Sequence, residues 1–314
     1  MVVENARVTL GLADGRRVVL SHLARRTDEF VEVLRTARAR ARRAALLQWT
    51  AGPPIDTYPT RVGGEPGQVV LFPDGVTVEP LNGPPRLAPL PLVEGVERDG
   101  YRITLHLRGA APVAVPPLAR RTDEFLIDLE RARRDLAART AAAWAALSPG
   151  LAGFPAPDGW AVDAAAAGGW WPHLRAAVAG GGAAGDGDGD RGPAALAVLE
   201  ALAGDRLRLG IELQGDAVLR FALAPHGDRV AVEGFGDDAR ATYVFRTASV
   251  DELNAVLLLT SFRREALHLP PERLGRWAVA VRTLEVVRRA RTALVARVVH
   301  TAGWAAAVEA ALRG

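Results

Sequence analysis

An internal repeat is the feature that most constrains how this chain can fold. Residues 7–49 align with residues 102–144 at a constant offset of 95 residues (7 to 102) and without a gap. The octapeptide Leu-Ala-Arg-Arg-Thr-Asp-Glu-Phe occurs unchanged at 23–30 and again at 118–125. Self-similarity at a fixed spacing indicates two copies of one supersecondary unit. The repeated residues form no reactive constellation, so they are informative about architecture first.

Each copy of the repeat predicts a β-hairpin followed by a helix. In the first copy, apolar and polar residues alternate over 7–12, Asp14-Gly15 supplies a tight turn, and 17–20 continue as a second strand. Thr27 is suited to cap a helix whose apolar stripe runs over 30–49. The second copy repeats this pattern, so hairpin and helix are expected there too.

Further β-structure is predicted upstream of the second copy. Short apolar segments separated by proline, asparagine or aspartate turns fall at 57–62, 68–72, 76–80, 90–96, 101–107 and 113–115. Together with the helix that begins at Thr122, they indicate about seven short antiparallel strands closed by one helix over residues 57–147. The expected fold class is therefore α+β.

Seven antiparallel strands closed by a C-terminal amphipathic helix resemble the pleckstrin-homology (PH-like) superfold over residues 57–147. The resemblance implies a β-barrel or sandwich whose helix inserts Phe125, Leu129 and Leu136 into one end. Residues 1–50 match only the last two strands and the helix, so a partial module truncated by about 40 to 50 residues is expected. Packing of this fragment on the rest of the chain, or pairing with a second molecule, is the alternative. With a partial module at 1–50 and a module at 57–147, the chain would be a tandem PH-like protein.

The rest of the chain carries weaker patterns. Residues 148–203 are rich in proline, glycine and tryptophan and are expected to form a linker with short helices, with a disordered loop over 180–192. Residues 204–314 predict a β-meander followed by helices, including a long helix over about 271–300. The helix start at Val250 echoes the repeated helices, so a divergent third module is the alternative for this region.

Several classes of enzyme are excluded by what the sequence lacks. It has neither cysteine nor lysine, which rules out thiolate nucleophiles, cysteine-ligated zinc, Schiff bases and lysine-containing phosphate loops. The six histidines are scattered without the spacing of a metal pair. The glycine run 180–185 lacks a preceding strand, and the aspartates of 186–190 lack the other ligands of a calcium loop. We expect no catalytic residue, no cofactor and no metal.

Charge and hydropathy bear on location and partners. All 39 basic residues are arginine, which is typical of a high-GC bacterial genome, and the formal net charge is only +3. This small excess is a weak indication of nucleic-acid or membrane binding. The sequence contains no run of about 18 uncharged apolar residues, which is the length needed to span a bilayer. We expect a cytoplasmic bacterial protein with no transmembrane segment and no specific nucleic-acid site. A third hypothesis is weak electrostatic attachment to anionic membranes or nucleic acid through the arginine-rich helices.

The best candidates for ligand binding are two pairs of arginines at the starts of the repeated helices, Arg25, Arg26, Arg120 and Arg121. Guanidinium groups beside the N–H groups of a helix start can hold phosphate or carboxylate. The alternative is structural, with contacts to backbone carbonyls or to Asp28 and Asp123 that fix the loop. The segment that would hold a lipid headgroup in a PH-like module, 61–67, contains one arginine and one glutamate. The resemblance therefore does not imply phosphoinositide binding.

Two functional hypotheses follow. The first is a non-catalytic interaction scaffold built from PH-like modules, which binds a protein partner or self-associates through sheet edges. The second is a small-ligand-binding protein, or an enzyme of unknown chemistry, with a pocket within 204–300. A deep pocket lined by Arg263, Arg264, Glu265 and His268 would favour the second hypothesis, and a flat surface there would exclude it.

Overall fold

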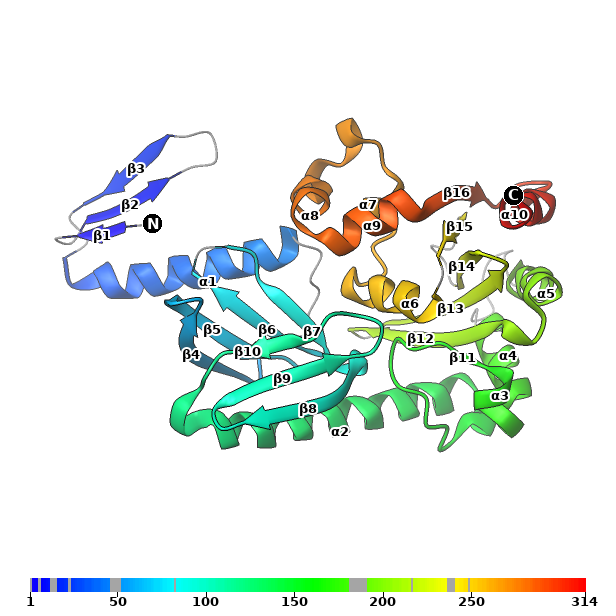
Figure 1. Cartoon of the computed structure of the whole chain (residues 1–314), viewed down its shortest axis with the longest axis horizontal. Helices are drawn as coiled ribbons and strands as arrows, with labels where there is room; N and C mark the ends of the chain where they lie inside the picture. The colour runs from blue at the N-terminus through cyan, green and yellow to red at the C-terminus, as the bar shows by residue number, and fades with distance from the viewer. Residues whose placement is uncertain are drawn as a thin grey trace.

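The computed structural model describes residues 2–4, 7–11, 16–21, 24–45, 52–81, 83–180, 191–215, 217–235, 241–247 and 249–314. Among these residues helices and antiparallel sheets are mixed, which confirms the α+β class. We describe three units in chain order: the N-terminal half-unit (2–45), the seven-strand unit (56–147) and the C-terminal unit (148–314), visible in Figure 1.

The seven-strand unit consists of two antiparallel sheets and a closing helix. The first sheet contains β4 (Asp56–Val62), β5 (Glu65–Leu71), β6 (Gly75–Pro80) and β7 (Arg86–Pro89) in that order. The second contains β8 (Val93–Asp99), β9 (Arg102–Leu107) and β10 (Val113–Val115), and α2 (Thr122–Leu147) follows. The predicted strand number and closing helix are confirmed. Of the two predicted forms, barrel or sandwich, the closed barrel is wrong, because the described strands form two separate sheets and neither is closed.

Helix α2 closes this unit with the apolar stripe that its sequence predicts. Phe125, Leu129 and Leu136 are all buried in the core formed with the two sheets. The ring of Phe125 meets that of Tyr58 on β4 edge to face, with centroids 5.3 Å apart. Further along α2, Trp144 joins a separate core with residues of the C-terminal unit. One helix thus packs into two cores.

The N-terminal half-unit has the same structure as the last part of the seven-strand unit. It contains β1 (Val2–Glu4), β2 (Arg7–Gly11), β3 (Arg17–Leu20) and α1 (Thr27–Ala45). Val8 pairs with Leu20, and at the repeat offset Ile103 pairs with Val115. The correspondence includes β1, whose residue Glu4 pairs with Arg7 as Asp99 pairs with Arg102. The prediction of two strands here was one strand short.

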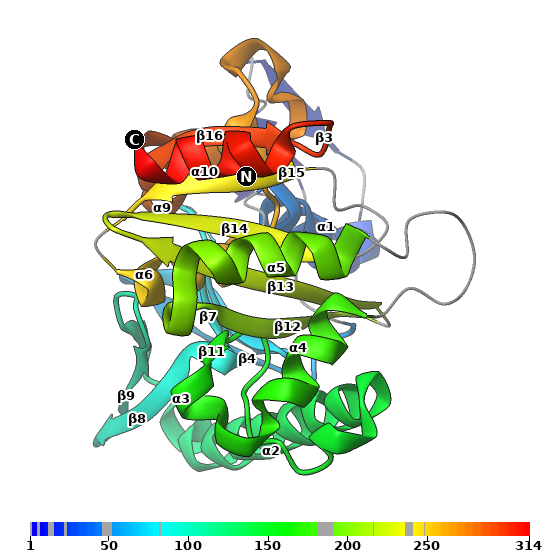
Figure 2. The ribbon, with the colours of Figure 1, turned by 90° about the vertical axis from the view of Figure 1, so that its right-hand side faces the viewer.

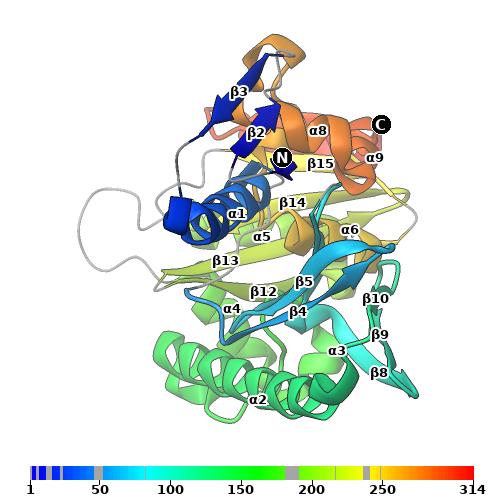
Figure 3. The same cartoon turned by 90° about the vertical axis from the view of Figure 1, so that its left-hand side faces the viewer.

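Helix α1 attaches the half-unit to the rest of the chain. It lies along the β4–β7 sheet on the side away from α2, as Figure 3 shows. Near its end, Arg42 Nη1 donates hydrogen bonds to the carbonyl oxygens of Pro80 and Leu81 at 3.1 and 3.2 Å. Burial lowers the pKa of Arg42, and the nearby charge of Arg38 adds to this effect.

The C-terminal unit is built on one six-stranded antiparallel sheet. Its strands, in sheet order, are β11 (Val162–Asp163), β12 (Arg208–Gln214), β13 (Ala217–His226), β14 (Arg229–Phe235), β15 (Ala241–Arg246) and β16 (Leu294–Val299). Figure 2 shows α3 (Ala164–Ala167), α4 (Trp171–Ala179), α5 (Arg191–Ala203) and α10 (Trp304–Arg313) on one side of the sheet. The other side carries α6 (Val250–Leu259), α7 (Glu265–His268), α8 (Ala278–Thr283) and α9 (Glu285–Ala293), which share a core with that face of the sheet. This single sheet differs from the four-plus-three arrangement of the seven-strand unit.

Two sequence expectations for this unit need revision. The long helix predicted over 271–300 is wrong, because the chain breaks into α8 and α9 and then forms β16, which hydrogen-bonds to β15. The segment 148–203 is more than a linker, since it supplies β11 to the sheet and packs α4 and α5 on it. Residues 181–190 of the predicted disordered loop lie outside the described residues.

Candidate functional site

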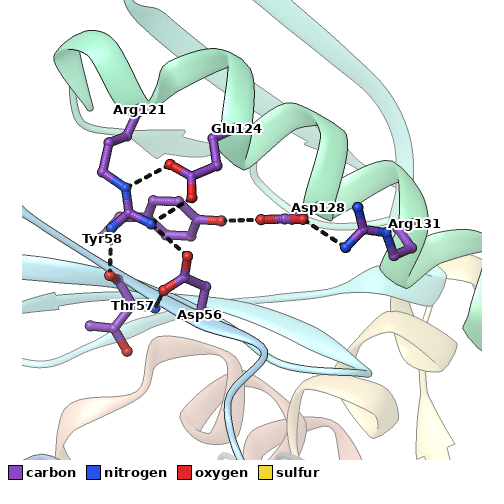
Figure 4. A network of polar contacts seen from close by, with 7 residues as sticks. All are labelled: Asp56, Thr57, Tyr58, Arg121, Glu124, Asp128 and Arg131. Atoms are coloured by element: carbon purple, nitrogen blue, oxygen red, sulfur yellow. Dashed lines mark hydrogen bonds and ion pairs between the residues drawn. The ribbon is translucent and has the colours of Figure 1, made fainter.

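Arg121, one of the four predicted ligand-binding arginines, lies at the centre of a polar network shown in Figure 4. It ends the short helix η3 (Ala119–Arg121) directly before α2. Its guanidinium group pairs with Asp56 on β4 at 2.5 Å and with Glu124 on α2 at 2.8 Å. It also donates to the carbonyl oxygen of Thr57 at 3.0 Å and lies over the ring of Tyr58, 4.4 Å from its centroid.

These contacts link the start of α2 to β4 and favour a structural role. The hydrogen bond to Glu124 raises the pKa of Arg121, and Arg121 in turn lowers the pKa of Glu124. Tyr58 donates its hydroxyl proton to Asp128 at 2.9 Å, and burial together with this bond raises the pKa of Tyr58. The carboxylates of Asp56, Glu124 and Asp128 lie close enough to hold a metal ion. Their oxygens already interact with Arg121, the Tyr58 hydroxyl, the N–H of Thr57 and Arg131.

The other three predicted arginines do not join this network. Arg25, Arg26 and Arg120 are exposed. Arg26 is the repeat counterpart of Arg121, yet the described residues of its own unit form three strands and include no equivalent of β4 for it to contact. The structure therefore keeps each arginine pair at the start of its own helix and brings the four into no common site.

Arg121→Ala is expected to lower the free energy of unfolding by about 1–3 kcal/mol, because it leaves Asp56 and the carbonyl of Thr57 without their charged donor. Arg120→Ala is the matched control, since the neighbouring side chain is exposed and its loss should cost at most about 0.5 kcal/mol. Urea unfolding followed by circular dichroism measures both. Equal losses for the two variants would contradict the structural role of Arg121.

A second group of polar residues surrounds a cavity of about 540 Å³ in the C-terminal unit. We call it the arginine pocket. It is lined by Gln214, Leu219, Ala241, Tyr243, Ser261, Phe262, Arg263, Arg264, Glu265, His268 and Arg297. The four residues named from the sequence, at 263, 264, 265 and 268, all line it. The structure therefore has a cavity at these residues, and not the flat surface that would have excluded a ligand site.

The turn after α6 positions Arg263 and Arg264, which follow it directly in sequence. Ser261 and Phe262 both adopt left-handed backbone conformations, with φ of 47° and 51°, at a cost of about 1–2 kcal/mol for each non-glycine residue. Two contacts offset this cost. Phe262 N–H donates to the carbonyl oxygen of Leu257 at 2.8 Å, and its ring packs on Phe221 with centroids 4.6 Å apart. The turn is thus anchored in the core while Arg263 and Arg264 follow it at the pocket.

Tyr243 on β15 brings two guanidinium groups together. Arg264 lies over the Tyr243 ring, 5.3 Å from its centroid, and Arg297 Nε on β16 donates to the Tyr243 hydroxyl at 3.4 Å. Gly234 on β14 makes room for Arg264, because a Cβ atom at this position would lie 2.9 Å from Arg264 Nη1. The sequence did not identify these three positions, although a glycine inside an apolar strand is a signal of close approach.

His268 adds a neutral hydrogen-bonding group to the pocket. Burial lowers its pKa, and the charges of Arg297 and Arg291 lower it further, so the ring is neutral near pH 7. His268 Nδ1 lies 3.0 Å from the carbonyl oxygen of Arg264. A carbonyl only accepts, which assigns the ring proton to Nδ1 and leaves Nε2 as an acceptor.

The charge of the pocket favours anions. Three arginines line it against one carboxylate, Glu265. Arginine presents several donors in a plane that matches the oxygens of carboxylate, sulfate and phosphate groups. A cavity of this size has room for a small organic oxyanion as well as for an inorganic one. Tyr243, Phe262 and Leu219 supply apolar surface for the remaining atoms of an organic ligand.

Comparison with known proteins does not identify the pocket. Neither the family models nor the curated proteins nor the solved structures contain a match to this chain. Among the described residues, no helix combines the length and apolar character needed to cross a bilayer. The candidate function therefore depends on the geometry of the site.

Proposed function

We propose that this protein binds a small organic oxyanion in the arginine pocket without transforming it. The observation that carries the proposal is the convergence of Arg263, Arg264 and Arg297 on one cavity of about 540 Å³. Bidentate donation by guanidinium groups supplies both charge and orientation for an oxyanion. The sequence led to the hypothesis of a small-ligand-binding protein, and the proposal specifies the ligand as an oxyanion.

Isothermal titration with sulfate, phosphate and citrate tests the proposal. Arg264→Met and Arg297→Met keep apolar bulk and remove the charge, so each should weaken binding by about tenfold or more, since a charged hydrogen bond contributes about 1.5–3 kcal/mol. Arg102→Met, at an exposed position on β9, is the matched control and should bind as the wild type does. Absence of binding by the wild-type protein, or equal weakening by the control, would contradict the proposal.

Gly234→Ala is expected to weaken oxyanion binding several-fold with little change in stability. The three atoms nearest to the added methyl group all belong to the flexible end of Arg264, which can move away, so the free energy of unfolding should change by less than about 1 kcal/mol. Titration and urea unfolding of the same sample separate the two effects. Unchanged binding would mean that the position of Arg264 beside Tyr243 is unimportant for the ligand.

A second candidate function is an interaction scaffold of tandem PH-like modules in the bacterial cytoplasm. The observation that favours it is the exposure of the half-unit. Val18 on β3 is 39% exposed, whereas its repeat counterpart Val113 is 6% exposed, and Phe30 is half-buried where Phe125 is fully buried. Strand β3 is also an edge of its sheet, and such an edge can pair with the same edge of a second copy.

Sedimentation velocity tests this second candidate. A dimer of the wild-type protein that Val18→Asp converts to monomer is the expected result, because a charge at the interface would remain unpaired when buried. Val279→Asp is the matched control, since Val279 is similarly exposed on α8. A wild-type protein that remains monomeric at high concentration would contradict self-association through the half-unit.

A further inference from the structure

A small cavity of about 30 Å³ lies next to the arginine pocket and collects three carboxyl groups from separate parts of the chain. Asp74 comes from the turn between β5 and β6, Asp158 from the segment before β11, and Glu212 from β12. The side chains of Asp158 and Glu212 are largely buried, with only 5% and 7% of these residues exposed. This volume suits about one water molecule. We call the three residues the carboxyl cluster.

The carboxyl cluster and the arginine pocket are directly connected. Ser261 lines both cavities. Gln214 lines the arginine pocket, and its Nε2 donates to Glu212 Oε2 at 2.7 Å. Arg263 lines the pocket and interacts electrostatically with Glu212. An anion bound in the pocket will therefore interact electrostatically with the carboxyl group of Glu212.

Charged groups on several elements face the cluster. Asp158 accepts the N–H of Leu213 at 2.8 Å, and the charge of Arg139 on α2 also favours its ionised form. Burial acts in the opposite direction and dominates, with Asp74 adding to it, so that the pKa of Asp158 is raised to about 7. Burial also raises the pKa of Glu212 well above its usual range, with contributions from Asp158 and Asp74, against Gln214 and Arg263.

We propose that oxyanion binding in the arginine pocket is coupled to proton uptake by the carboxyl cluster, so that the ligand binds more tightly as the pH falls. This inference rests on the proposed function. An ionised Glu212 repels an anion in the pocket and competes with it for the charge of Arg263. Once Glu212 is protonated, both effects disappear. Because linkage is reciprocal, the anion raises the proton affinity of the cluster by the same factor, and the proton comes from the solvent.

His268 is the other titratable group that could produce the same direction of pH dependence. It lines the pocket itself and gains a positive charge when protonated, which would also strengthen anion binding. The lowered pKa of His268 places that effect at more acidic pH than the titration of the cluster. Variants at both places are needed to separate the two sources.

Sulfate is a suitable probe, because it remains a dianion over the relevant pH range. Titration calorimetry of the full chain from about pH 5.5 to about pH 8, in buffers of different ionisation enthalpy, should show net proton uptake and binding about tenfold weaker at the alkaline end. Glu212→Gln keeps a hydrogen-bonding group for Gln214 and should bind sulfate tightly throughout, with the proton uptake reduced. Asp158→Asn is a second variant of the cluster, with the same expected direction. His268→Gln should retain the wild-type dependence above about pH 6.5.

The outcomes distinguish this inference from the proposed function. Sulfate binding that is independent of pH and takes up no proton would overturn the coupling and leave the oxyanion site intact. Loss of the pH dependence in His268→Gln but not in Glu212→Gln or Asp158→Asn would also overturn it, because the pocket itself would then be the titrating group. Absence of sulfate binding by the wild-type protein at every pH would contradict the proposed function instead. The wild-type proton count is decisive even if one cluster variant fails to fold.

Discussion

Phe125→Ala is expected to lower the free energy of unfolding by about 3–5 kcal/mol, whereas Phe30→Ala should lower it by only about 1–2 kcal/mol. The two residues end identical octapeptides, so local sequence is matched. Phe125 is fully buried and packs edge to face on Tyr58. Phe30 begins the corresponding stripe of α1 and is only half-buried, and the part of its unit that the structure describes holds no four-stranded sheet.

Equilibrium unfolding in urea measures both losses, provided that the slope of stability against denaturant remains the same. The comparison isolates tertiary packing, because the seven residues that precede the phenylalanine are identical in the two copies. Equal losses would show that α1 is packed as tightly as α2, through a surface that the half-buried state of Phe30 does not reveal. A larger loss at Phe30 would contradict the difference in burial between the two phenylalanine side chains.

The repeat made the hairpin and helix of both copies predictable, and the structure shows that the two hairpins also share their pairing register. Alternation and turn residues are local features, and they produce the same hairpin and helix at 7–45 and 102–147. The predicted threonine cap is wrong for α2, because Thr122 lies inside the helix and its hydroxyl donates to the carbonyl oxygen of Ala119 at 2.8 Å. Strand β1 was not predictable in the same way. Val2–Glu4 and its counterpart 97–99 have different side chains, and both become strands because each lies beside a strand with unpaired backbone groups.

Tertiary contacts also decided the outcome in the last part of the chain. The valine-rich segment of β16 follows the arginine-rich helix α9. No glycine or proline separates the two segments, so nothing in the sequence marks the end of the helix. The apolar spacing alone did not separate helix from strand. Pairing with β15 selects the strand, since the edge of the sheet offers hydrogen bonds that a longer helix would leave unmade.

The candidate site was predictable only where its residues are contiguous. Arg263, Arg264 and His268 lie within one turn and one short helix, so the sequence places them together. Tyr243 and Arg297 contact one another across 54 residues, and Asp158 reaches Leu213 across 55 residues. Such contacts depend on the order of the strands in the sheet and on the position of the segment before β11 beside β12. Neither can be predicted from a local sequence pattern.

Asp158→Asn is expected to change the pH dependence of stability by about 3 kcal/mol between about pH 5 and about pH 8. An aspartate in the unfolded chain has a pKa of about 3.9, while burial raises the pKa of Asp158 to about 7 in the folded protein. Between these values the folded state binds a proton that the unfolded state has released. The stability that this carboxyl contributes at acidic pH is therefore lost as the pH rises through the folded pKa.

Asparagine removes this dependence, because it remains neutral and its Oδ1 can still accept the N–H of Leu213, which Asp158 binds at 2.8 Å. The variant should gain stability relative to the wild type at alkaline pH, where the wild type must keep a charge buried. Urea unfolding at the two pH values measures the change, with the exposed Asp205→Asn as the matched control, whose difference from the wild type should stay within about 0.5 kcal/mol. A constant difference between Asp158→Asn and the wild type would mean that Asp158 is ionised in the folded protein at both pH values. The carboxyl cluster would then have no proton to exchange at that position, and Glu212 alone would have to carry the coupling to the arginine pocket.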